Sequence, residues 1–252
     1  PFDVQVYSSN ADEDFHQEIA LLEKETQVNE VYTYRIYKNG TNQVNAYLYS
    51  HLREFGPDYR KADGTPDMEK INRNDEMVYC DYDTYMGISD YNHLRKMLDL
   101  PEIALKEDAY AIHIKERVWG QTGDFSGQIE VAGPDGRLSF AGYHTESFSQ
   151  DGHNGGDYIL VVPDAVLEGM NPYYAEMAVD IEGNAPANLQ SLLDNIEQDT
   201  EKVNFQGHVM TEAAADDWEG EELGNSCSGS DSIVVYAAKN LGRDTLVPES
   251  KY

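Results

Sequence analysis

Runs of alternating apolar and polar residues recur along the chain and predict half-buried β-strands. The first run covers Phe2–Tyr7, and Val28–Tyr37 returns to the same alternation. Between them the pattern predicts a helix that has Asn10 as its N-cap and ends near Gln27. Acidic residues fill its first turn, where the helix dipole favours them, and apolar residues recur at helical spacing at Phe15, Ile19 and Leu22.

Turn residues and further strand patterns fill the middle of the chain. Asn39-Gly40 indicates a hairpin turn into a strand at Val44–Tyr49. A helix capped by Ser89 is predicted to stop before Pro101, and a short helix is predicted at Pro163–Met170. The remaining strands predicted for this part are Glu76–Met86, Ala109–Ile114, Gly127–Val131, Arg137–Gly142 and Tyr158–Val162.

The last part of the chain repeats the opening pattern. A strand at Tyr173–Ile181 precedes a helix at Pro186–Lys202 and a strand at Val203–Met210. An acidic loop at Asp216–Gly229 and a strand at Ile233–Ala238 follow. Both ends of the chain are therefore predicted to be β-α-β units, and two such units can pair into one sheet with their helices on one face.

These elements predict an α+β fold for a single domain covering residues 1–252. The simplest arrangement folds the two ends together into one lobe, residues 1–55 with 172–252. A strand-rich second lobe, residues 56–171, is then inserted between them.

Charge is the strongest compositional feature, because 18 Lys and Arg face 47 Asp and Glu, for a net charge of −29. A surface this acidic repels phosphate backbones and so argues against a nucleic-acid partner. The acid excess is typical of a well-solvated secreted or cell-surface domain. No stretch matches the twelve-residue calcium loop of EF-hands, and the seven histidines form no zinc-binding pair, so no metal site is predicted.

Two cysteines, Cys80 and Cys227, are too few for a disulfide scaffold. Cys80 lies in an apolar run and Cys227 in a Gly/Ser-rich loop, which favours two free thiols, although one bridge stays open. No stretch is long and apolar enough for a membrane span, and no signal peptide is present. The chain begins at Pro1 without a methionine and enters strand-like sequence at once, which suggests a fragment excised from a longer protein.

One segment resembles a known family. Ile88–Pro101, with the sequence ISDYNHLRKMLDLP, and the following Ala104–Ile112 resemble the large extracellular loop of FtsX-like permeases of Gram-positive bacteria. Such loops often carry a strand, the motif S-x-x-Y-N-x-L, a short helix and a strand. Asp157–Asp164 and the opening Pro1–Val6 agree with the pattern, and the resemblance spans roughly Pro1 to Ala238.

The resemblance implies a two-lobe ectodomain like that of MacB-type permeases, on the extracellular side of the cell membrane. Its membrane-proximal lobe would contain both chain ends and join transmembrane helices of the same permease. A separate cytoplasmic ABC ATPase would hydrolyse ATP, so the chain would be neither an enzyme nor a cofactor protein. Consistently, it has no G-x-x-x-x-G-K-[ST] phosphate loop. An extracellular peptide, lipid or protein would be its cargo or partner.

Two alternatives stay open at this point. Asp81, Asp83 and Thr84 mimic the D-x-D-x-T nucleophile loop of haloacid-dehalogenase-like phosphatases, which would make the chain a secreted Mg²⁺-dependent phosphatase. Against it, some eighty residues precede the motif, which normally ends the first strand of its domain. The other alternative is a stand-alone binding domain on the cell surface.

Three aromatic residues in loop-like sequence are candidate binding residues: Trp119, Phe125 and Trp218. Exposed aromatic side chains on loops are common hot spots for partners. The competing interpretation is that each ring folds back onto the core and anchors its loop.

Overall fold

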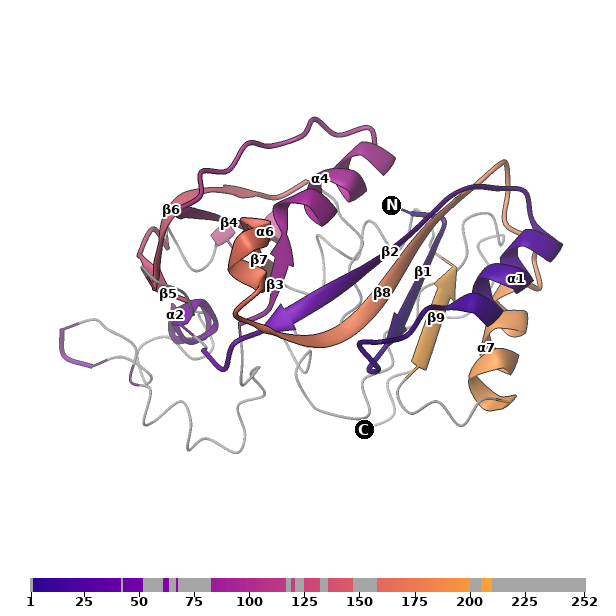
Figure 1. Cartoon of the computed structure of the whole chain (residues 1–252), viewed down its shortest axis with the longest axis horizontal. Coiled ribbons are helices and arrows are strands. Elements are labelled where there is room, and N and C mark those ends of the chain that lie inside the picture. Colours follow the sequence, from indigo (N-terminus) through magenta and orange to yellow (C-terminus); the bar gives the residue numbers. More distant parts are fainter. Residues whose placement is uncertain are drawn as a thin grey trace.

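The computed structural model describes residues 2–41, 43–51, 61–63, 67, 83–116, 119–120, 125–131, 136–146, 158–199 and 205–209. Nine strands form one mixed sheet in the order β5-β6-β4-β7-β3-β2-β8-β1-β9 (Figure 1). The strands are β1 (Val4–Ser8), β2 (Val28–Lys38), β3 (Tyr85–Gly87), β4 (Ala109–Ile114), β5 (Ile129–Glu130), β6 (Arg137–His144), β7 (Tyr158–Val162), β8 (Asn171–Ile181) and β9 (Phe205–Val209). The helices are α1 (His16–Glu25), α2 (Gln43–His51), α4 (Ile88–Met97), α6 (Asp164–Leu167) and α7 (Leu189–Asp199).

The two predicted β-α-β units interleave at one end of the sheet. β8 pairs antiparallel with both β1 and β2, so it lies between the two strands of the unit β1-α1-β2. In the same way, β1 lies between β8 and β9 of the unit β8-α7-β9. This is a split β-α-β arrangement, in which each unit supplies the central strand of the other.

Helices α1 and α7 cover the same face of these four strands, which we call the first face. Their apolar side chains pack with alternate residues of β1 and β8 in one core. Its buried members are Val4, Val6, Phe15, Leu22, Ala175, Met177, Val179, Ile181, Leu189 and Leu193.

The other half of the sheet contains β3 to β7, with β3 parallel to β7 and β4 parallel to β6. Side chains alternate along β2, so Val31 and Tyr37 point to one face and Tyr34 and Ile36 to the other. Val31 packs in the core under α1 and α7, and Tyr37 packs with the core under α2 and α6. These four helices therefore share the first face, where they build two separate cores.

Helix α4 lies alone on the opposite face, which we call the second face. Tyr91 and Leu94 of α4 pack with Met86 of β3 and with residues of β2 and β8, including Ile36 and Ala178. This core is continuous across both halves of the sheet. The structure is thus a mixed α and β domain with helices on both faces, consistent with the predicted fold class.

The hairpin and strand predicted after Asn39-Gly40 are wrong, because Gln43–His51 form helix α2. Gly40 adopts a φ of 80°, and the chain then enters the helix. Val44 and Leu48, four residues apart, both point into the core. Short sequence patterns of this kind fit a strand or a helix, and here a distant carboxylate, described below, stabilises the helix.

The predicted start of the first helix is also wrong. Asn10 accepts a hydrogen bond from the amide of Asp12 within a turn, and α1 begins only at His16. Phe15 precedes the helix in a left-handed conformation with a φ of 55°, and its ring is fully buried. Burial of this ring in the core offsets the unfavourable backbone conformation.

The two predicted lobes correspond only in part to the halves of the sheet. Strands β1, β2, β8 and β9 come from the terminal segments, and β3 to β7 come from the central one. Helix α2, however, belongs to the predicted first lobe by sequence and packs in the core of the other half. The division into lobes stays a prediction. The predicted strand Ile233–Ala238, most of Glu76–Met86, and both cysteines lie outside the described residues.

Candidate functional site

A polar network lies between α4 and the second face of the sheet. The hydroxyl of Tyr91 lies 2.6 Å from Nδ1 of His113 on β4. Arg95, one turn after Tyr91, donates from Nη1 to the same hydroxyl oxygen at 3.3 Å, from Nε to the carbonyl of Pro101 at 2.6 Å and from Nη2 to Glu146 at 2.9 Å. Tyr91, Arg95 and His113 are all buried.

Burial decides the protonation states in this network. It lowers the pKa of His113 to about 3, so the ring is neutral at physiological pH. The hydrogen bond from Arg95 lowers the pKa of Glu146 to about 2, so this pair stays ionised. The Tyr91 hydroxyl oxygen accepts from Arg95, and the same hydroxyl shares a hydrogen bond with Nδ1 of the neutral His113 ring.

Hydrogen bonds of this network connect elements that are distant in the sequence. Arg95 connects α4 to the segment after it, through Pro101, and to Glu146, which follows β6. Its guanidinium is engaged with oxygens of the protein. The pKa of Tyr91 in this network is raised by burial. Perturbed pKa values mark catalytic sites and also structural ion-pair networks, and these contacts fit a structural network that positions α4.

Asp83 lies at the N-terminus of α2 and acts as a cap supplied from a distance. Its carboxylate accepts hydrogen bonds from the amides of Val44 and Asn45, at 3.2 and 2.9 Å, and from the hydroxyl of Tyr158 at 2.8 Å. The side chain is fully buried, and this burial raises its pKa to about 6. A carboxylate so enclosed cannot approach a phosphate ester, which argues against the phosphatase hypothesis; its other residue, Asp81, lies outside the described residues.

Two of the three candidate aromatic residues fall within the described residues, and both pack toward the core. Trp119 is 6% exposed and stacks on Phe140 of β6. Phe125 is partly buried and meets Tyr47 of α2 edge to face, with ring centroids 4.8 Å apart. Both positions agree with the loop-anchor interpretation. Trp218 lies outside the described residues.

Sequence reasoning missed the aromatic residue that is most accessible. Tyr143, near the end of β6, is 45% exposed, and its ring stacks on Trp119 with centroids 4.1 Å apart. Among the described residues it is the exposed large hydrophobic side chain. Strict alternation along β6 would place Tyr143 on the opposite face from Phe140, and the irregularity in the pairing of β6 with β4 brings both rings against Trp119, which the sequence does not signal.

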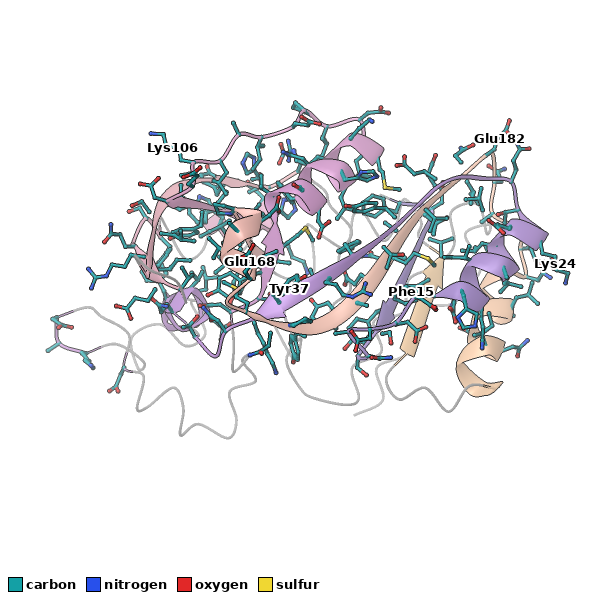
Figure 2. The ribbon with its side chains drawn as sticks, in the orientation of Figure 1. Phe15, Lys24, Tyr37, Lys106, Glu168 and Glu182 are labelled. Carbon is teal, nitrogen blue, oxygen red and sulfur yellow. The ribbon has the colours of Figure 1, made fainter. Side chains whose placement is uncertain are left out.

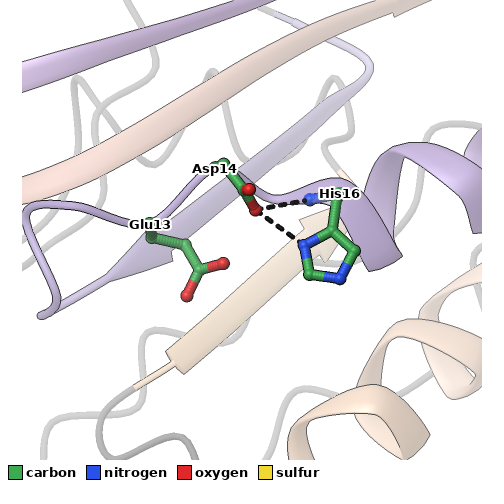
Figure 3. A group of neighbouring side chains, drawn as sticks. All are labelled: Glu13, Asp14 and His16. Carbon is green, nitrogen blue, oxygen red and sulfur yellow. Dashed lines mark hydrogen bonds and ion pairs between the residues drawn. The ribbon is translucent and has the colours of Figure 1, made fainter.

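Three side chains before and at the start of α1 lie close enough to share a metal ion: Glu13, Asp14 and His16 (Figure 3). Asp14 Oδ1, however, accepts from both the amide and Nδ1 of His16, and Glu13 accepts from the amide of Phe15. These contacts fix the turn that leads into α1. The cluster is therefore explained by the local fold.

The first and last described strands lie side by side. Val4 at the start of β1 pairs with Val209 at the end of β9. The N-terminal end of β1 and the C-terminal end of β9 therefore lie next to each other at one end of these strands. From there β8 and β2, each eleven residues long, run together across the molecule to β3 (Figure 1).

No protein-family model and no curated protein matches the chain. Within the described part of the chain, no helix is both long and apolar enough to cross a membrane. Among solved structures, the 1.5 Å crystal structure of a candidate lipoprotein from Bacillus anthracis is similar to this chain. The TM-score is 0.40 at 10% sequence identity, over 81% of this chain and 95% of that chain.

Proposed function

We propose that the chain is the extracellular domain of an FtsX-like ABC transporter permease. In this role it performs no catalysis, binds an extracellular cargo or partner, and relays motion that a cytoplasmic ATPase drives. The half of the sheet with β1 and β9 is the membrane-proximal lobe, and the half with β3 to β7 faces away from the membrane.

The observation that supports this proposal best is the pairing of Val4 with Val209. A domain inserted between two transmembrane helices has to receive and return the chain on the same side. The first and last described strands, β1 and β9, are neighbours in one sheet, which agrees with this requirement. They also let two flanking helices act on the domain together, because a displacement of either helix moves the same pair of strands.

The long pair of strands β2 and β8 provides a path for such a displacement. Eleven residues of strand extend for about 35 Å. One end of this pair lies beside β1, and the other end reaches β3 through the pairing of Tyr37 with Tyr85. Force applied to β1 and β9 is thus carried along backbone hydrogen bonds to the half that contains α4.

The decisive experiment uses the complete coding sequence in its native membrane. We expect apolar spans on both sides of the chain and an ATP-binding cassette protein that co-purifies with the product. A cysteine in place of Lys24, whose side chain is 76% exposed, should react with a membrane-impermeant maleimide in intact cells. The Lys24→Cys substitution is made in a background with Cys80 and Cys227 replaced by serine, and that background without the Lys24 substitution is the control.

The outcomes separate the remaining hypotheses. Surface labelling without an ATPase partner or flanking spans would show a stand-alone binding domain and refute the transporter proposal. Labelling only after the cells are lysed would refute an extracellular location. Phosphatase activity that is lost in Asp83→Asn would favour the hydrolase, against the enclosed position of this carboxylate.

A further inference from the structure

We propose that the two halves of the sheet pivot about the pairing of β2 with β3, and that a polar clasp between β2 and α4 holds the closed position. We call the pairing of Tyr37 with Tyr85 the seam. The clasp consists of Glu30 and Tyr32 on β2 with Asp90 and His93 on α4. The pivot deepens the proposed relay of motion, and it is measurable in the chain alone.

The seam is the narrowest junction in the sheet. β2 meets β3 in a single residue pair, Tyr37 opposite Tyr85, whereas β2 pairs with β8 along almost its whole length. A register irregularity between Ile36 and Tyr37 lies next to this point. Such bulges bend a strand locally and increase its twist. Among the described residues the strand pairing is therefore short where the two halves join, and it is supplemented by Thr41, just after β2, which accepts from the amide of Asp83 and lies 2.8 Å from the Tyr85 hydroxyl.

The hydrophobic cores on the two faces of the sheet differ at the seam. On the first face, the core under α1 and α7 and the core under α2 and α6 are separate, and Arg35 of β2 donates to the carbonyl of Glu13 on this face. On the second face, one continuous core crosses the seam. Bending about an axis in the plane of the sheet at the seam would move α4, which directly follows β3, relative to β2, so that contacts between α4 and β2 on the second face hold the two halves together.

The clasp joins β2 to α4 on the second face. The rings of Tyr32 and His93 stack with centroids 3.6 Å apart, and Nε2 of His93 lies 2.7 Å from Glu30. The Tyr32 hydroxyl donates to Asp90 at 2.7 Å. The ion pair is open to solvent, with His93 34% and Glu30 46% exposed. Pairs of this kind contribute little free energy and exchange readily with water, as a reversible clasp requires.

Figure 2 shows positions for a direct test, because Lys24 and Glu182 lie at one end of the molecule, Lys106 lies toward the other end, and Glu168 lies nearer the middle, close to Tyr37 in this view. These four label sites are all exposed. Spin labels at Lys24 and Lys106 measure the distance across the seam by double electron–electron resonance. Pairs within one half, Lys24 with Glu182 and Lys106 with Glu168, are the internal references. All labelled chains carry serine in place of the two native cysteines.

We expect His93→Ala to widen the distance distribution across the seam by a few ångströms and to leave both reference pairs unchanged. His16→Ala is the matched control, since His16 is also an exposed histidine paired with a carboxylate but lies before α1. Tyr32→Phe keeps both rings and removes only the bond to Asp90, so it should give a smaller widening.

Two results would overturn the pivot. One is a cross-seam distribution as narrow as the references in every variant. The other is equal widening of all three pairs, which would show general loosening of the fold. Neither result bears on membrane topology or on an ATPase partner, so the pivot and the proposed function can fail separately.

Discussion

The cap that Asp83 supplies to α2 leads to a prediction about stability with a defined dependence on pH. Asp83→Ala removes the acceptor for the amides of Val44 and Asn45 and for the hydroxyl of Tyr158. Losing a helix cap costs about 0.5–2 kcal/mol, and each buried donor left without an acceptor costs about 1–3 kcal/mol. Removing a buried charge offsets part of this loss at neutral pH.

The size of that offset follows from the pKa. Burial raises the pKa of Asp83 from its ordinary value of 3.8 to about 6 in the folded state. The difference is about 2 pKa units, or roughly 3 kcal/mol. Because the folded pKa is the higher one, the folded state binds the proton more tightly. This contribution to stability is therefore present below pH 4 and lost as the pH rises through about 6.

We expect Asp83→Ala to be less stable than the native chain by about 2 kcal/mol at pH 7, and by roughly 3 kcal/mol more near pH 4. Urea denaturation followed by circular dichroism at several pH values gives the difference between variant and native chain. The other carboxylates titrate in both proteins, so their effect on the free energy of unfolding cancels in this difference. Asp83→Asn should show the same dependence on pH with a smaller loss at every pH, because it keeps an acceptor but does not titrate.

A difference between Asp83→Ala and the native chain that stays constant from pH 4 to pH 7 would refute the reasoning about the buried charge. Equal losses in Asp83→Asn and Asp83→Ala at every pH would refute the cap, because the retained carbonyl oxygen would then contribute nothing.

Three further substitutions test the packing described above. A Cβ on Gly87 would clash with Oδ1 of Asp164, which accepts a hydrogen bond from the amide of Ser89. Gly87→Ala should therefore lower the free energy of unfolding by about 1–3 kcal/mol in urea denaturation. Gly120→Ala is the control and should be neutral, because a Cβ there meets no other atom. Arg95→Met removes the partner of Glu146, and because water can still reach the Glu146 carboxylate, the cost stays below that of a fully buried unpaired charge. We expect a loss of about 2–3 kcal/mol in the free energy of unfolding, measured in thermal melts. No loss would show that the network contributes nothing. Trp119→Ala should cost about 3–5 kcal/mol, and a loss under 1 kcal/mol would contradict its burial.

Local pattern was enough to predict the elements whose own residues define them. β1, β2, β4, β7 and β8 were recognisable because their side chains alternate or are continuously apolar, and α7 because one face is apolar. The same reasoning failed for α2, whose N-terminus is capped by Asp83 from far along the chain. A contact between residues so distant in sequence leaves no periodic signal.

The candidate site was less predictable for the same reason. Its members come from α4, β4 and the segment after β6, and although Tyr91 lies in the Y-N motif quoted above, that motif does not connect it to Arg95 or His113. The spacing of Tyr91 and Arg95 indicated only a shared helix face. Trp119 shows the opposite difficulty, because glycines around an aromatic residue indicate a loop but do not reveal whether the ring turns inward.

The interleaving of the two β-α-β units has a consequence for how the chain acquires its structure during synthesis. β1 is made first, yet both of its neighbours, β8 and β9, are among the last described strands to leave the ribosome. Loop-closure entropy makes such distant pairings slow to form. The valine side chains of β1 can therefore be buried between their partner strands only after β8 and β9 have been synthesised, so folding of this end of the sheet is a late event.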